Sequence, residues 1–268
     1  MARIIHIGAC AMALAFAPAV MQGLSAQDKA YGQELGTPLN PISPELRRTF
    51  EEVVRDYLLK NPAIIREAMR VLQTQEDAAK QARAALALKQ YRSELVLDVH
   101  SPVGGNPKGD ITVVSFFDYN CGYCKRVALT VSAVLKSDPK VRVVYKELAI
   151  LGPQSILAAR AALAAKRQGK YHEFHGALMS AERANADSVA AIASDLALDY
   201  AKLVKDMEDP AIDEQLERTY RLATAIGING TPAFVIGDRL VAGAINARAM
   251  NEIIVAERAK MEAVSVGN

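Results

Sequence analysis

Two cysteines, Cys121 and Cys124, have the spacing that is typical of redox chemistry. The third cysteine of the chain, Cys10, lies in an apolar leader that we expect to be removed. A disulfide between Cys121 and Cys124 would close a very small loop, so it would constrain little of the unfolded chain. The pair is therefore better suited to exchange with other disulfides than to hold a fold together.

The histidines do not complete a structural zinc site with these cysteines. Zinc needs two further ligands, and the mature chain offers only His100, His172 and His175, without a second CxxC pair. His172 and His175 are three residues apart, whereas the HExxH motif separates its histidines by four, so we interpret both as helix-surface or packing residues. The sequence thus predicts no metal and no cofactor. Copper(I) bound by the CxxC pair stays open as an alternative, because soft thiolates suit that ion.

The segments on either side of the cysteines predict a strand, a helix and a second strand. Residues 111–117 form a short apolar run rich in β-branched and aromatic residues, which is typical of a buried strand. Residues 125–136 carry apolar side chains at helical spacing, and residues 141–148 predict the next strand. The CxxC pair is therefore expected at the point where a strand leads into a helix.

That position would favour the reactive form of Cys121. A thiolate, not a thiol, attacks a disulfide, and the unpaired N–H groups at a helix amino terminus stabilise negative charge. Lys125 and Arg126 add positive charge nearby. We expect Cys121 to be the attacking thiolate and Cys124, one helical turn further on, to resolve the mixed disulfide.

Four segments resemble the thioredoxin superfamily and, within it, the exported DsbA-like branch that carries a helical insertion. They read FFDYNCGYCKR (116–126), YKELAILGPQS (145–155), GKYHEFHGALM (169–179) and GINGTPAFVIG (227–237). The resemblance covers roughly residues 95–262. It implies an α/β thioredoxin fold over residues 98–268 with a helical insertion at about 153–226, and catalytic roles for Cys121 and Cys124.

The resemblance also implies a peptide-binding loop at Thr231–Pro232. In the family the matching proline follows a cis peptide bond beside the CxxC pair, where the preceding backbone pairs with an extended substrate. Thr231, Pro232, Gly122 and Tyr123 are thus predicted to bind clients. On the residues alone, Thr231–Pro232 also fits an ordinary turn after Gly230.

The residues between and near the cysteines resemble the disulfide isomerases of the DsbC type. These residues are Gly122, Tyr123, Thr231 and Asp118. Strongly oxidising DsbA enzymes usually have a histidine between the cysteines and a valine before the proline, and this chain has neither. We therefore predict isomerase or reductase activity, with a DsbA-like oxidase as the alternative.

One residue departs from the family pattern and leaves the proton acceptor for Cys124 open. The family often has a buried acid six residues before the first cysteine, where this chain has Ser115. Glu147 and Lys146 are the candidates that the sequence offers for moving the proton of Cys124.

The amino-terminal part of the chain predicts export and assembly. Residues 1–26 read as a secretory signal peptide and residues 27–43 as a flexible leader, so we expect a periplasmic protein. Residues 44–97 predict amphipathic helices that resemble the oligomerisation region of the suppressor-of-copper-sensitivity C proteins. We predict a homo-oligomer, a dimer or trimer, joined through this segment. A helical cap folded on its own domain is the alternative.

Composition limits the remaining partners. The chain has 268 residues, 51% of them hydrophobic, which is enough for a sizeable core. Its formal net charge of +2 leaves no basic excess to hold a nucleic-acid backbone, so we expect no nucleic-acid partner. The partners that the resemblance implies are exported proteins that are unfolded or wrongly disulfide-bonded, and a membrane redox protein that resets the CxxC pair.

Overall fold

The computed structural model describes residues 43–266. The predicted signal peptide, and residues 27–42 of the predicted leader, lie outside the described residues. The chain divides into two compact units between Met69 and Arg70. Within the described residues, no helix is both long enough and apolar enough to cross a membrane.

Two helices form most of the amino-terminal segment. Helix α1 (Pro44–Lys60) begins at Ser43, whose side chain accepts a hydrogen bond from the backbone N–H of Leu46, as a capping serine before a proline predicts. Helix α2 (Ala63–Gln90) follows the Asn61–Pro62 break. Helix α2 ends before Tyr91, and the short helix α3 (Arg92–Val96) follows, so the predicted helical segment 44–97 consists of three helices.

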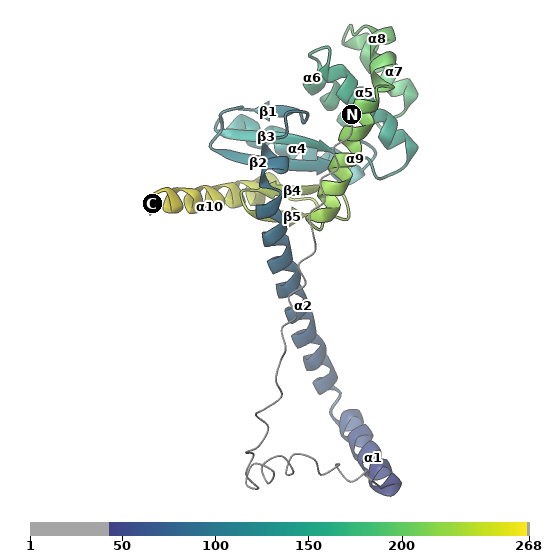
Figure 1. Ribbon diagram of the computed structural model, residues 1–268, viewed down its shortest axis with the longest axis vertical. Coiled ribbons are helices and arrows are strands. Elements are labelled where there is room, and N and C mark those ends of the chain that lie inside the picture. Colours follow the sequence, from purple (N-terminus) through teal and green to yellow (C-terminus); the bar gives the residue numbers. More distant parts are fainter. Residues whose placement is uncertain (1–42, 267–268) are drawn as a thin grey trace, which may run out of the picture. The chain divides into compact units, whose positions relative to one another are not determined.

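The second unit is built on a five-stranded sheet with the order β1-β3-β2-β4-β5 (Figure 1). Its strands are β1 (Val103–Gly105), β2 (Ile111–Phe117), β3 (Val141–Glu147), β4 (Ala233–Ile236) and β5 (Arg239–Ala242). Strands β2 and β3 are parallel, and the other three pairings are antiparallel. Strands β2 and β3 confirm the two strands that the sequence predicts at residues 111–117 and 141–148. The sequence predicted no strand at the position of β1.

Helices cover both faces of the sheet because its central strands are apolar on both sides. Val113, Phe117 and Val143 belong to one core cluster with residues of α4 (Gly122–Ser137) and α10 (Ala247–Val266). Val114, Phe116 and Val144 belong to a second cluster with residues of α3 and α9 (Pro210–Ala225) and with Leu88 of α2. The last turns of α2 and helix α3 are thus part of the core of this unit.

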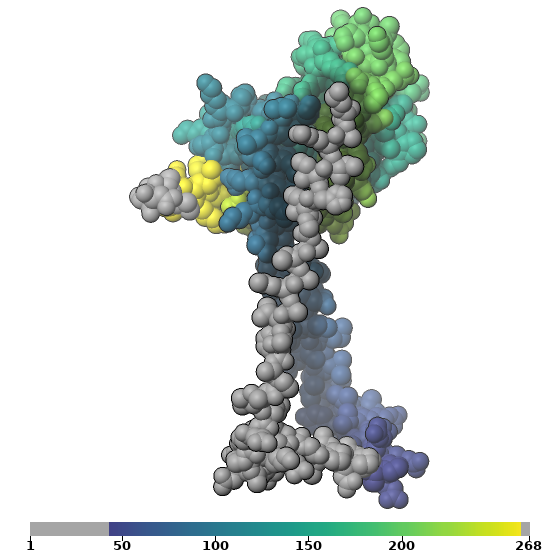
Figure 2. All heavy atoms as spheres, viewed as in Figure 1, coloured from purple at the N-terminus to yellow at the C-terminus, as the bar shows by residue number. Residues whose placement is uncertain are grey.

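Five helices between β3 and β4 form the insertion: α5 (Pro153–Lys166), α6 (Tyr171–Ser180), α7 (Ala186–Asp195), α8 (Tyr200–Met207) and α9. Helix α5 has eight buried residues, six of them alanines, and it contacts all four of the others. Small side chains allow this close approach. The insertion forms a lobe at one end of the sheet, seen in teal and green (Figures 1 and 2). The second unit is therefore an α/β thioredoxin fold with a helical insertion, as expected.

Candidate active site

The two cysteines lie where β2 leads into α4. Cys121 is the N-cap residue of α4, and its Sγ accepts a hydrogen bond from the backbone N–H of Cys124 at 3.4 Å. Both thiols are free and nearly buried, with 7% of Cys121 and 1% of Cys124 exposed. Burial raises the pKa of the Cys124 thiol to about 12. The two sulfur atoms therefore have different environments. The sulfur of Cys121 contacts the amino terminus of α4, whereas the sulfur of Cys124 is enclosed by protein.

The Thr231–Pro232 loop faces both cysteines, and its peptide bond is cis, as the resemblance implies. The Sγ of Cys121 donates to the carbonyl oxygen of Thr231 at 3.4 Å. A hydrogen bond with the Thr231 side chain lowers the pKa of Cys124 and so opposes part of the effect of burial. Four of the six predicted site residues, Cys121, Cys124, Thr231 and Pro232, thus come together from two distant segments.

The other two predicted site residues, Gly122 and Tyr123, lie on the exposed first turn of α4. The Tyr123 ring is 61% exposed, and the guanidinium carbon of Arg126 lies 4.3 Å from its centroid. Such a cation–π contact holds the ring in one orientation. Gly122 and Tyr123 are therefore accessible to a partner beside the buried sulfur atoms.

Lys125 and Arg126 have partners other than the Cys121 sulfur. The Lys125 ammonium donates to the carbonyl oxygens of Leu178 and Ala181, at the carboxyl end of α6. A cation there complements the negative end of the helix dipole. Lys125 thus connects α4 to the insertion, and the backbone N–H of Cys124 is the hydrogen-bond donor to the Cys121 sulfur.

Asp118 and Asn120 hold the loop that leads into Cys121. The buried carboxylate of Asp118 accepts hydrogen bonds from the hydroxyl of Ser155 and from the backbone N–H groups of Asn120, Ile150 and Leu151. The Asn120 side chain exchanges two hydrogen bonds with the backbone of Ala184, at 2.9 and 3.0 Å. The sequence marked Asp118 only through the family resemblance, because three of its four partners, Ile150, Leu151 and Ser155, are 32 to 37 residues away.

The two candidates for moving the proton of Cys124 point to opposite sides of β3. Lys146 belongs to the α3 side, where its ammonium donates to Asp98 at 2.7 Å and to the carbonyl of Glu94. Glu147 is buried on the side of α4 and α6, where its Oε1 accepts from the hydroxyls of Tyr119 and Tyr171 at 2.9 and 2.6 Å. Burial raises the pKa of Glu147 to about 8.

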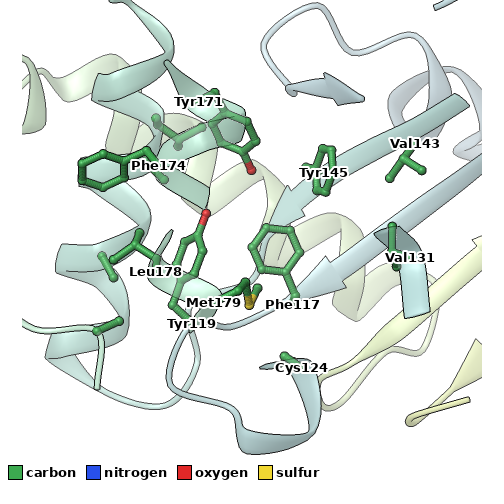
Figure 3. Packing of buried hydrophobic residues seen from close by; sticks show 14 of the residues in the cluster. Phe117, Tyr119, Cys124, Val131, Val143, Tyr145, Tyr171, Phe174, Leu178 and Met179 are labelled. Atoms are coloured by element: carbon green, nitrogen blue, oxygen red, sulfur yellow. The ribbon is translucent and has the colours of Figure 1, made fainter. Parts of the chain in front are cut away.

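His175 joins this buried cluster, whereas His172 is exposed. The Nδ1 of His175 lies 3.0 Å from the Tyr119 hydroxyl, and burial lowers the pKa of the ring to about 3. Figure 3 shows the Tyr119 and Tyr171 hydroxyls pointing towards one another. Between Ser43 and Val266, no group of three or more His, Cys, Asp or Glu side chains is placed to hold a metal ion. His175 thus packs among the rings of this cluster, and His172 lies at the surface.

Two thiols at a helix amino terminus beside a cis-proline loop, on a thioredoxin fold, define a thiol–disulfide oxidoreductase. The DSBA-like thioredoxin domain family matches residues 112–255, which is more than half of the chain. The protein therefore belongs to the DSBA-like thioredoxin family. The N-terminal domain of copper resistance protein ScsC matches residues 47–79.

Two solved structures resemble this chain over almost their whole length. A thioredoxin-like oxidoreductase from Silicibacter pomeroyi DSS-3 is 46% identical, with a TM-score of 0.61, and the match covers 62% of this chain and 97% of that one. ScsC of Proteus mirabilis, in a transitional conformation, is 30% identical, with a TM-score of 0.62 and coverage of 80% and 97%. These matches agree with an oxidoreductase of the DsbA and ScsC type.

A curated relative of a different kind shares only part of its length with this chain. The Na(+)/H(+) antiporter NhaA of Herminiimonas arsenicoxydans is 28% identical over 160 residues. That match covers 58% of this chain but 25% of the antiporter, so the chain spans about a quarter of that relative.

Proposed function

We propose that this oxidoreductase is a protein disulfide isomerase and reductase. Cys121, as a thiolate, attacks a client disulfide and forms a mixed disulfide, and the other client sulfur leaves as a thiolate that takes up a proton. That client sulfur, again as a thiolate, then attacks a second client disulfide, and the client thiolate freed there attacks the mixed disulfide and releases Cys121, which completes the isomerisation. In a reduction, Cys124 instead attacks Cys121 and releases the reduced client. The observation that carries this proposal is the contact of the Cys121 sulfur with the helix N-terminus and with the Thr231 carbonyl, at 3.4 Å each.

Client binding is assigned in this proposal to the surface around the cysteines. Gly122 and Tyr123 are exposed beside them, and Thr231 faces the pair. An extended client would lie along Thr231–Pro232 with Tyr123 against its side chains. The Gly-Tyr dipeptide and the threonine before the proline, which resemble the DsbC type, favour isomerisation over oxidation.

The proposal also includes assembly and export. Residues 44–97 would join two or three copies, so that their active sites surround one client and act on it repeatedly. Exposed apolar side chains on α1 and the match to the ScsC N-terminal domain support this role. We place the protein in the periplasm, where a membrane redox protein would return the CxxC pair to its working state.

The deciding experiment compares two reactions of ribonuclease. Refolding of scrambled ribonuclease measures isomerisation, and the gain of activity by reduced ribonuclease measures oxidation. We expect the first to exceed the second, with Cys121→Ser inactive in both. A faster second reaction would favour a DsbA-like oxidase. Repeating both with Cu(I) tests the copper alternative, which predicts tight, stoichiometric copper binding that Cys124→Ser abolishes.

A further inference from the structure

Closure of the CxxC pair requires a proton acceptor for Cys124. The thiol of Cys124 is enclosed, and burial raises its pKa to about 12, so few molecules carry it as the thiolate that closure needs. Ser115 offers only a hydroxyl group, which is too weak a base to take up a proton at neutral pH. Lys146 is on the opposite side of β3 and is already paired with Asp98. Neither residue therefore meets the requirement.

Glu147 combines a buried carboxyl group with an unsatisfied oxygen. Across residues 43–266, its Oε2 is the one buried side-chain oxygen or nitrogen that lacks a hydrogen-bond partner. Its other oxygen accepts from Tyr119, in the active-site loop, and Tyr171, on α6. The negative charge of nearby Asp118 adds to burial in raising its pKa to about 8, close to the range in which a general base works best.

A hydrogen-bonded chain connects Glu147 to His175. The single hydroxyl proton of Tyr119 is donated to Glu147, so the oxygen of Tyr119 must accept from the Nδ1–H of His175. The ring is neutral because burial lowers its pKa to about 3. This assignment of the tautomer leaves Nε2 unprotonated and able to accept a proton.

A cavity of about 620 Å³ joins His175 to Cys124. It lies between α4, α6 and the sheet, and Ser115, Tyr145, Cys124 and His175 are among the residues that line it. Its volume is ample for water, and its polar side chains supply hydrogen-bonding partners. Water in this cavity would bridge the Cys124 thiol and the free nitrogen of His175.

We propose that Glu147 is the proton acceptor for Cys124, reached through cavity water, His175 and Tyr119. The inference deepens the proposed function and rests on it. The Cys124 proton passes to Nε2 of His175 as the Nδ1 proton passes to Tyr119 and the Tyr119 proton to Glu147. The Cys124 thiolate then attacks the Cys121 sulfur, the Cys121–Cys124 disulfide forms, and the client leaves as a thiolate. Glu147 later returns its proton to solvent.

The test separates attack from closure with a small disulfide, 5,5′-dithiobis(2-nitrobenzoate), mixed in equal amount with the reduced full-length protein. Attack by Cys121 releases the first thionitrobenzoate, and closure by Cys124 releases the second. In Glu147→Gln we expect the second release to slow about 100-fold at pH 7, because the amide still accepts from both tyrosines but takes no proton. The first release should stay unchanged. In the wild type, the rate of the second release should rise with pH around a midpoint near 8, and this rise should be absent in Glu147→Gln.

Two further variants control this test. Glu257→Gln removes another buried carboxylate, on α10, and should close at the wild-type rate. Tyr119→Phe keeps the ring and the carboxyl group but breaks the relay, so it should slow the second release as Glu147→Gln does. A wild-type second release and pH profile in Glu147→Gln, or fast closure in Tyr119→Phe, would overturn the proposal. A different result would count against the isomerase proposal alone. In that result the wild-type protein closes its CxxC pair through Glu147 as expected but does not refold scrambled ribonuclease.

Discussion

Helices α1 and α5 use their apolar side chains in different ways. Helix α5 has 14 residues and buries eight of them among its neighbours in the insertion. Helix α1 has 17 residues and buries none, so that Phe50 is 55% and Tyr57 56% exposed. Large contiguous patches of exposed apolar side chains mark surfaces that bind a partner. The comparison indicates that α5 stabilises the fold, and the exposed side chains of α1 support its proposed role in assembly.

Removing the exposed helix should have the largest effect on assembly and little effect on the fold. A chain that begins at Arg70 keeps Leu88 and Leu95, which are buried against the sheet. We expect light scattering to find a dimer or trimer for the full mature chain and a monomer for the shortened one. Refolding of scrambled ribonuclease should fall about tenfold as several sites no longer act on one client.

The shortened chain also supplies its own control. Alkylation of Cys121 should proceed at the rate of the full chain, because the core and the active site are intact. A full mature chain that is monomeric at micromolar concentration would contradict the assembly proposal. A shortened chain that keeps full isomerase activity would remove the link between assembly and function.

Single phenylalanine substitutions should separate the two regions by stability. Phe174 of α6 is completely buried, so Phe174→Ala should lower the free energy of unfolding by about 3–5 kcal/mol through lost burial and a cavity. Phe50→Ala should change it by less than about 0.5 kcal/mol in the monomer, since Phe50 is exposed. Urea titrations at a concentration where the chain is monomeric measure both values. Equal losses would show that α1 is part of the folded core.

The buried carboxyl group of Glu147 should make stability depend on pH. Its pKa is about 8 in the folded chain against 4.5 when unfolded. Because folding raises this pKa, its stabilising contribution is complete below pH 4.5 and is lost as the pH rises to 8. The expected slope is about 1.4 kcal/mol per pH unit across that window.

Glu147→Gln provides the matched comparison for this pH dependence. Urea titrations between pH 4.5 and 8 should show a flatter profile for the variant than for the wild type. Two profiles of the same slope would mean that Glu147 ionises in the folded chain as it does in water.

The smallest expected effect is at Thr231. Thr231→Val removes the side-chain hydrogen bond that lowers the pKa of Cys124, so this pKa should rise further. Loss of a hydrogen bond that contributes about 1 kcal/mol should slow closure of the CxxC pair roughly fivefold. Thr231→Ser keeps the hydroxyl and should close at the wild-type rate. Equal rates in Val and Ser variants would show that the hydroxyl has no part in closure.

Local patterns were sufficient for most elements. Apolar β-branched runs predicted β2 and β3, and apolar side chains at helical spacing predicted α4. Strand β1 was missed because its three residues, two of them glycines, become a strand only by pairing with β3 about forty residues later. Its signal lies in the partner strand and not in the segment itself.

For the active site, the sequence by itself determined the chemistry and the class of protein. The Cys121–Cys124 spacing, the strand that leads into a helix and the four family segments specify a dithiol oxidoreductase, since these signals lie within short stretches of chain. Tertiary structure alone decided the neighbours of those thiols. It directed Lys125 to the end of α6 and placed Glu147, Tyr119 and His175 together from three separate segments. Burial and hydrogen-bond distance depend on packing between such segments, and no local pattern records them.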